Sequence, residues 1–221
     1  MATIKNIAIH HAGGLGADNY ASTRHLTVSH INKAHKERWN FPSKFLQTSE
    51  GRFAGYNVIY DPKNRSFTQC RALGEETMAQ IGYNFDTFSM CIIGNYTRKL
   101  MTNPSEKVDP LDEQMKGDII NFLYDLINGN KRGLFLAPGT ILDLSATRVR
   151  PHRFYQNTTE CYGTGIPDTF FLDLLIQFKP VVVMAPNGKG KDQLLEERGV
   201  LLQLIMQLIA KVSAITEQLK Q

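Results

Sequence analysis

Cysteine is scarce in this chain, and the few cysteines that occur are scattered. Cys70, Cys91 and Cys161 lie far apart among 221 residues. An odd number of unclustered cysteines excludes the disulfide framework that is typical of small secreted domains. The start of the sequence also lacks a basic segment followed by an apolar one, so we expect no export signal.

A strong charge imbalance is missing as well. Charged residues make up 21% of the chain and hydrophobic residues 42%, and the net charge at pH 7 is +4. These proportions exclude a disordered, collagenous or multispanning membrane chain and are typical of a globular protein with a full core. The mild positive charge favours loose attraction to an anionic polymer. Without a run of lysine and arginine, however, it predicts no nucleic-acid interface.

Strand and helix periodicities alternate along most of the chain. Strands are predicted at residues 4–9, 56–60, 66–70, 89–94 and 147–150. Helices are predicted from Ser22 as the N-cap to Trp39, from Asp109 to Gly129, and over residues 168–178. The alternation predicts an α/β fold in which a mixed central β-sheet is flanked by helices. This first domain is expected to span residues 1–184.

The composition changes after residue 184. Residues 185–193 are rich in glycine and lysine and predict a flexible linker. In residues 194–221 apolar positions recur at alternating spacings of four and three, which predicts a C-terminal heptad helix and a homo-oligomer formed through it. The alternative is an amphipathic helix that folds back on the first domain or lies on a membrane. Its apolar run is too short to span a bilayer, so we expect no stable membrane insertion.

Two histidines and one cysteine form the strongest candidate metal site. Imidazole and thiolate donors such as His10, His152 and Cys161 suit zinc, and three protein ligands leave a fourth position for water. His10 ends a predicted strand, and the polar loop 153–160 separates the other two residues. Spacing alone leaves open an alternative, in which the histidines cap a strand or lie on the surface and the cysteine is an inert core thiol.

Short motifs support the metal site, and they follow one another along residues 4–178. They are Ile-Ala-Ile-His-His-Ala at 7–12, Ala-His-Lys-Glu-Arg-Trp at 34–39, Gly-Tyr-Asn-Val-Ile-Tyr-Asp at 55–61, and His-Arg at 152–153 followed by Thr-Thr-Glu-Cys-Tyr-Gly at 158–163. In residues and order they resemble the zinc-dependent N-acetylmuramoyl-L-alanine amidases, a family that includes phage amidase-type lysozymes and the peptidoglycan recognition proteins. Asn57 departs from the family pattern, because many members have histidine there.

The resemblance implies a mechanism and the residues that carry it. His10, His152 and Cys161 would hold Zn²⁺, whose bound water attacks the amide between N-acetylmuramic acid and the L-alanine of the stem peptide. Tyr56 would orient that water or donate to the oxyanion, with a half-buried strand aromatic as the alternative. Thr159 occupies a position that is lysine in some phage enzymes, and we expect it to position the oxyanion less strongly than lysine would.

The resemblance also implies bacterial peptidoglycan as the partner and a bacteriolytic, endolysin-like role. A bacterial enzyme that recycles wall fragments would use the same chemistry. The rival is a non-catalytic peptidoglycan-binding or virion structural module of the same fold, although such binders typically have a broken zinc triad and this triad is intact. Without an export signal, the expected location is the host cytoplasm until release to the wall, or the virion.

Overall fold

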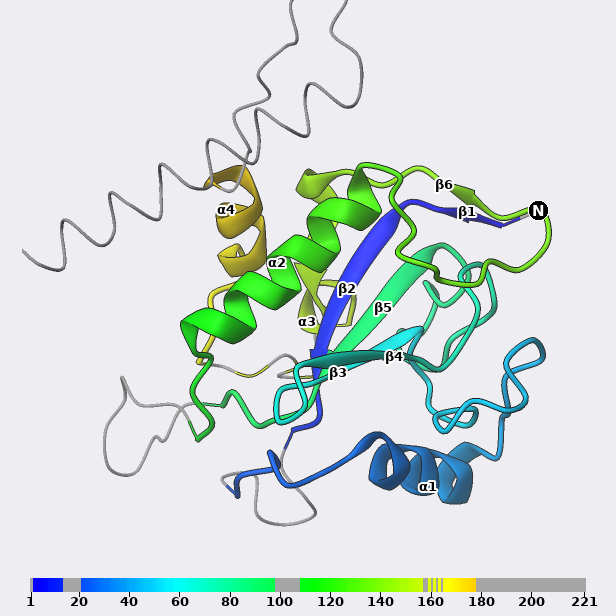
Figure 1. Ribbon diagram of the computed structural model, residues 1–221, viewed down its shortest axis with the longest axis horizontal. Coiled ribbons are helices and arrows are strands. Elements are labelled where there is room, and N and C mark those ends of the chain that lie inside the picture. The colour runs from blue at the N-terminus through cyan, green and yellow to red at the C-terminus, as the bar shows by residue number, and fades with distance from the viewer. Residues whose placement is uncertain are drawn as a thin grey trace, which may run out of the picture. The chain divides into compact units, whose positions relative to one another are not determined.

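A mixed β-sheet lies at the centre of the computed structural model (Figure 1). The structure describes residues 2–13, 21–97, 108–156, 159, 161, 163 and 165–177. Within these residues the sheet has five strands in the order β4 (Ser66–Gln69), β3 (Val58–Asp61), β5 (Thr87–Ile92), β2 (Asn6–His11) and β7 (Val149–Pro151). All neighbours are parallel except β3 and β4, which form an antiparallel hairpin. The mixed sheet is therefore confirmed.

The strands near the middle of the sheet are buried on both faces, as their sequences require. Every residue of β5 is buried, and so are the four inner residues of β2. Burial of successive residues along a largely apolar strand is typical of a parallel strand that is covered on both faces. A separate pair, β1 (Thr3–Ile4) and β6 (Ile141–Leu142), extends the structure beyond the sheet.

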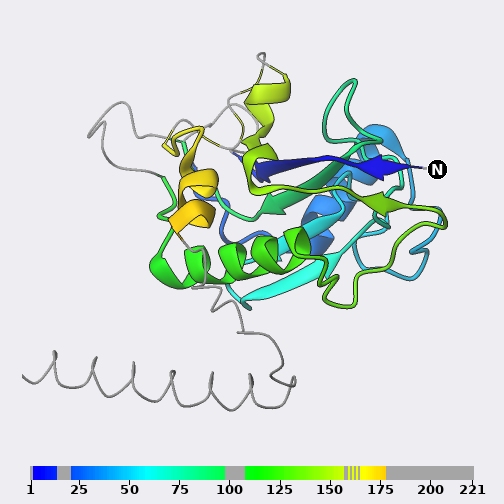
Figure 2. The same cartoon turned by 90° about the horizontal axis from the view of Figure 1, so that it is seen from above.

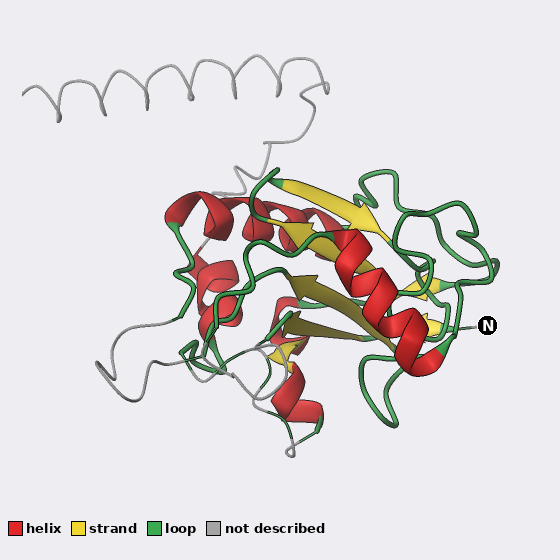
Figure 3. Ribbon diagram, turned by 90° about the horizontal axis from the view of Figure 1, so that it is seen from below, coloured by secondary structure: helices red, strands yellow, loops and turns green. Residues whose placement is uncertain are grey.

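Helices cover both faces of the sheet. Helix α1 (Val28–Trp39) lies across one face (Figure 3), where Val28 and Ile31 pack with Ile59 and Cys91. Helices α2 (Glu113–Ile127) and α4 (Phe170–Gln177) pack together on the opposite face (Figure 2). That face holds the larger core, built from α2 residues such as Ile119 against Met90 and its neighbours. Side chains of β5 thus alternate between two cores, as the strand period requires.

Two predicted helix starts are wrong, for one shared reason. Helix α1 begins at Val28 with Thr27 as its N-cap, and α2 begins at Glu113 with Asp112 as its N-cap. The residues expected to cap them bond to each other instead: the Ser22 hydroxyl donates to the buried carboxylate of Asp109. The same carboxylate accepts backbone N–H groups from Thr23 and Asn95. Asp109 therefore ties two loops together rather than opening a helix.

Two short elements lead to the site, and they differ from the prediction. The strand expected over residues 147–150 is a 3₁₀ turn, η1 (Ala146–Arg148), followed by β7, and a short helix α3 (His152–Tyr155) starts directly after it. The predicted linker 185–193 and heptad helix 194–221 lie outside the described residues and stay predictions. In the part of the chain that the structure describes, no helix combines the length and apolarity needed to cross a bilayer.

Candidate metal centre

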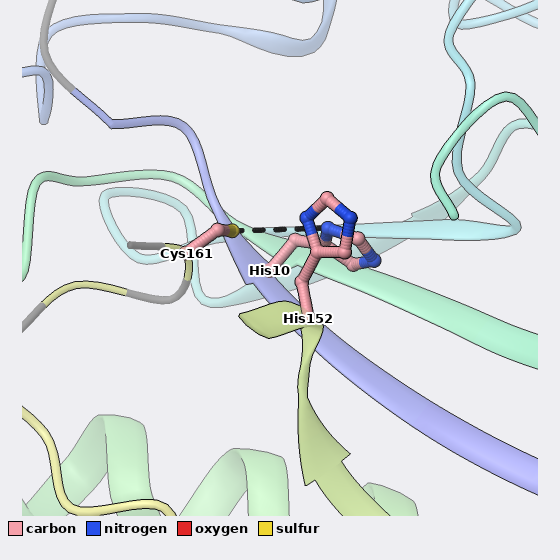
Figure 4. Close-up of side chains that lie close together, drawn as sticks. All are labelled: His10, His152 and Cys161. Carbon is pink, nitrogen blue, oxygen red and sulfur yellow. Dashed lines mark hydrogen bonds between the residues drawn. The ribbon is translucent and has the colours of Figure 1, made fainter. Parts of the chain in front are cut away.

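The three predicted metal ligands come together at one end of the sheet (Figure 4). His10 lies near the C-terminal end of β2, and His152 starts α3 immediately after β7. Because β2 and β7 are parallel neighbours paired through Ile9 and Pro151, the residues that follow these two lie side by side. The rings of His10 and His152 are 4.4 Å apart between centroids. The chain then turns back after α3 and brings Cys161 to the same point.

The distances fit a zinc ion. The donor atoms of His10, His152 and Cys161 all lie within 4.8 Å of one another, and Nδ1 of His10 is 3.8 Å from Sγ of Cys161. In a tetrahedral zinc site, a nitrogen and a sulfur ligand lie about 3.6 Å apart. Nδ1 of His10 and Sγ of Cys161 already have about this separation. A pair of donor atoms at the 4.8 Å limit would have to approach by about 1 Å. Two imidazoles and a thiol are also a donor set that zinc prefers.

Burial sets the protonation of these ligands. Burial lowers the pKa of His10, and the nearby His152 lowers it further, so His10 is neutral as a ligand must be. Burial also lowers the pKa of His152. It raises the pKa of the Cys161 thiol to about 12, although the backbone N–H of His11 opposes the shift. A metal ion that binds here has to displace the thiol proton.

The loop that carries Cys161 is held by its neighbours on both sides. The backbone N–H of His11 lies 3.3 Å from Sγ, and the hydroxyl of Thr159 accepts the backbone N–H of Cys161 at 3.2 Å. The Arg153 backbone donates to the carbonyl of Cys161, while its guanidinium donates to the carbonyls of Gly163 and Ile166. Thr159 therefore lies beside the cysteine, where it supports the turn at Cys161.

The ligands line a cavity of about 800 Å³. This volume lies within the range of small-molecule binding sites. Its other walls mix aromatic, basic and amide side chains: His35, Arg38, Trp39, Tyr56, Gln80, Asn84 and Gln156. Thr159 also lines it. A cavity with this lining offers both flat apolar surfaces and hydrogen-bonding groups to a polar ligand.

Tyr56 lies in this wall, between two histidine rings. Its ring centroid is 5.0 Å from that of His10 and 5.4 Å from that of His35. Burial raises the pKa of Tyr56 well above its ordinary value, and a hydrogen bond with Cys91 raises it further. The phenol is therefore protonated and able to donate a hydrogen bond. His35 packs against Trp39 and accepts a hydrogen bond from the backbone N–H of Gly55.

Two glutamines at the site were not predicted from the sequence. The amide of Gln80 lies 2.7 Å from Nε2 of His10, and the amide oxygen of Gln156 lies 3.2 Å from Nε2 of His152. Neither sits in a motif with a local signal. Asn57, which stands where the family has histidine, is buried away from the cavity lining and joins the carbonyl of Ala72 to the backbone of Ser89.

Comparison with known proteins places this fold. No family model matches the sequence, and no curated protein does. The solved structure of the Ph2119 endolysin from Thermus scotoductus MAT2119 bacteriophage Ph2119 is similar, with a TM-score of 0.50 and 12% identity over 79% of this chain and 86% of the endolysin. This likeness shows a shared α/β fold and confirms the predicted architecture.

Two further solved structures are similar at lower TM-scores. One is the N-acetylmuramoyl-L-alanine amidase LysC from Clostridium intestinale URNW, with 18% identity, a TM-score of 0.47 and coverage of 80% of this chain and 97% of the amidase. The other is Drosophila PGRP-LB, with 16% identity, a TM-score of 0.44 and coverage of 85% of this chain and 88% of that protein.

Proposed function

We propose that this chain, which has the fold of phage endolysins and peptidoglycan recognition proteins, is a zinc-dependent peptidoglycan amidase. Its substrate bond is the amide between N-acetylmuramic acid and the L-alanine of the stem peptide. The observation that carries the proposal is the convergence of His10, His152 and Cys161 in the wall of one cavity. Proteins of this fold that only bind the wall do not need three intact metal donors, so the complete set favours the hydrolase.

The metal donors have a defined task in this reaction. His10 and His152 would hold the metal through neutral nitrogens and Cys161 through its sulfur, and three protein ligands would leave a position for solvent or substrate. Zinc bound there supplies Lewis acidity towards a carbonyl oxygen and activates water near neutral pH. The stiffness of β2 and the bonds around Cys161 keep the donors in position as substrate enters.

Tyr56 acts on the reacting amide, and Thr159 supports the turn that carries a metal donor. The protonated phenol of Tyr56 donates a hydrogen bond to the oxygen on which negative charge develops, which favours the transition state over the ground state. To reach that oxygen, the hydroxyl exchanges its contact with Cys91 for one with substrate. Thr159 carries no positive charge and contributes by shaping the turn at Cys161.

Removal of single ligands tests the proposal. In His10→Ala or Cys161→Ala, we expect lysis of bacterial walls to be abolished while the circular dichroism spectrum is unchanged. His25→Ala is the matched control, because His25 is exposed and outside the cavity. Zinc stoichiometry of the purified protein and mass spectrometry of digested walls identify the metal and the bond cut. If either ligand variant lyses walls as fast as the parent, the assignment is wrong.

The same assay separates the hydrolase from a binding module. A hydrolase releases intact stem peptides with a free L-alanine amino group from the glycan. A module that only binds would sediment with walls and release none, even with one zinc per chain. That result would replace the proposed activity with peptidoglycan binding.

A further inference from the structure

Gln80 links the ligand His10 to strand β5 through buried polar side chains. Its side-chain amide lies 2.7 Å from Nε2 of His10 and 2.9 Å from the hydroxyl of Ser89. His10 and Gln80 are each 1% exposed, and Ser89 is fully buried. A buried glutamine with a partner at each end of its amide is held firmly, because breaking either bond leaves a polar group unpaired.

The second histidine ligand has a similar partner. Nε2 of His152 lies 3.2 Å from the amide oxygen of Gln156, one turn further along α3. Each imidazole thus presents Nε2 to a glutamine. In His10 the other nitrogen, Nδ1, faces Sγ of Cys161 at 3.8 Å. In each ring Nε2 is therefore occupied by its contact with a glutamine, and Nδ1 is the nitrogen that remains for a metal.

A metal ligand of this kind requires a particular tautomer. A neutral imidazole that coordinates through Nδ1 carries its proton on Nε2, so Nε2–H needs an acceptor. Gln156 offers its oxygen. Gln80 offers an oxygen to His10 when its amide is turned by 180°, and its NH₂ then donates to the Ser89 hydroxyl. Gln80 keeps its contacts with His10 and Ser89 after this rotation, because the NH₂ group and the oxygen of the amide simply exchange positions.

The orientation with the Gln80 nitrogen towards Nε2 suits the other tautomer of His10. There Nδ1 carries the proton and directs it towards the sulfur of Cys161, which is the arrangement of a site without metal. Gln80 can therefore satisfy His10 in both forms. A carboxylate at the same place can accept hydrogen bonds but cannot donate them. It would therefore favour the tautomer of His10 that carries its proton on Nε2 and binds metal through Nδ1.

We propose that Gln80 and Gln156 are positioning residues that hold His10 and His152 with the proton on Nε2, so that both histidines bind the metal through Nδ1. The inference rests on the zinc site of the proposed function and adds the coordinating atoms and the side chains that select them. Hydrogen-bonded partners of ligating histidines typically change metal affinity by about 10- to 100-fold when they are removed.

Zinc affinity of the full chain, measured by competition with a chromophoric chelator, tests the role of Gln80. We expect Gln80→Leu to weaken zinc binding about 10- to 100-fold. Gln80→Glu should bind zinc at least as tightly as the parent, because its carboxylate accepts both Nε2–H of His10 and the Ser89 hydroxyl. Gln177→Leu, at an exposed glutamine, is the matched control. Equal affinities of Gln80→Leu and the parent would overturn the proposal.

Histidine tautomers provide a second readout that does not depend on a variant folding. Long-range ¹H–¹⁵N spectra of the zinc-loaded parent should show protons on Nε2 and the metal on Nδ1 of His10 and His152. A proton on Nδ1 of His10 in that state overturns the inference. Zinc binding with the expected tautomers but without amide cleavage would overturn the proposed function alone. A parent chain that binds no zinc would overturn both.

Discussion

The phenol of Tyr56 lies beside His10 with its ring held by two histidines, so its hydroxyl can be removed without disturbing the packing. We expect Tyr56→Phe to lower the rate of amide hydrolysis about a hundredfold, the usual cost of losing one donor to an oxyanion. Zinc content should not change, because Tyr56 is not a ligand. Tyr83→Phe, at a tyrosine outside the cavity lining, is the control. A Tyr56→Phe enzyme with full activity would leave the residue as a packing aromatic.

His35 makes the stability of the fold depend on pH. Burial lowers its pKa to about 4, and its Nδ1 accepts the backbone N–H of Gly55, which requires a neutral ring. The unfolded chain takes up this proton near pH 6.5, before the folded protein does. The stabilisation from neutral His35 is therefore complete above about pH 7 and decreases as the pH falls towards 4.

Substitution isolates this contribution. Between pH 8 and pH 5, His35 should account for a loss of about 2 kcal/mol in the free energy of unfolding. The glutamine side chain in His35→Gln does not titrate. Between pH 8 and pH 5 the free energy of unfolding of this variant, measured in urea, should therefore fall by about 2 kcal/mol less than that of the parent. The other histidines contribute equally to both proteins. Parallel pH profiles for the two would contradict the assigned protonation.

At the scale of elements, α3 and the loop after it work as one unit. Arg153 follows the proposed metal ligand His152 in α3, and its guanidinium donates to the carbonyls of Gly163 and Ile166 and to the carboxylate of Asp168. Only a planar fork with several donors reaches three acceptors in this way. The segment that contains Cys161 is therefore fastened to the element that contains His152.

Loss of this fork should loosen the metal centre. We expect Arg153→Lys to weaken zinc binding about tenfold, because one ammonium group cannot replace the three contacts. The increase in melting temperature on addition of zinc measures this affinity, and it should be smaller in Arg153→Lys than in the parent. Arg148→Ala, at an exposed arginine in η1, is the control. An unchanged zinc affinity in Arg153→Lys would show that the loop holds its position without the guanidinium.

At the scale of the whole molecule, the heptad helix predicted over residues 194–221 would set how many copies of the first domain act together. Its apolar seam includes Leu201 and Leu208. In full-length protein, Leu201→Glu with Leu208→Glu should convert an oligomer into a monomer, since charge at the seam opposes helix association. The control is Gln203→Glu with Gln207→Glu. These substitutions add the same charge outside the seam and should leave the oligomer intact. Sedimentation velocity measures the oligomeric state of the parent and of both double variants. A monomeric parent would contradict the predicted homo-oligomer.

Oligomerisation would matter for activity on intact walls. A repetitive polymer presents many sites, so linked domains bind with an effective concentration that single domains lack. We expect the monomeric variant to keep its rate on short soluble fragments and to lose lytic activity on walls at low protein concentration. Equal lysis by both proteins would show that a single domain is sufficient for wall cleavage.

The sequence by itself determined the α/β class and the strands that form β3, β4 and β5, because periodicity and apolar runs are local properties. It also pointed to His10, His152 and Cys161 as candidate metal ligands, through motifs whose order along the chain resembles a known family. It did not identify the true starts of α1 and α2, because a buried carboxylate bonded across two loops took the residues expected to cap them.

Only the tertiary structure decided which side chains surround those ligands. Gln80 reaches His10, and Arg153 reaches the turn at Gly163, through contacts that exist once the parallel strands are in register. Asn57 stands at a family histidine position, yet its neighbours make it a buried link between the backbone at Ala72 and strand β5 at Ser89. Local patterns record which faces of an element are apolar. Hydrogen bonds between residues far apart depend on how the elements pack, and they leave no period in the sequence.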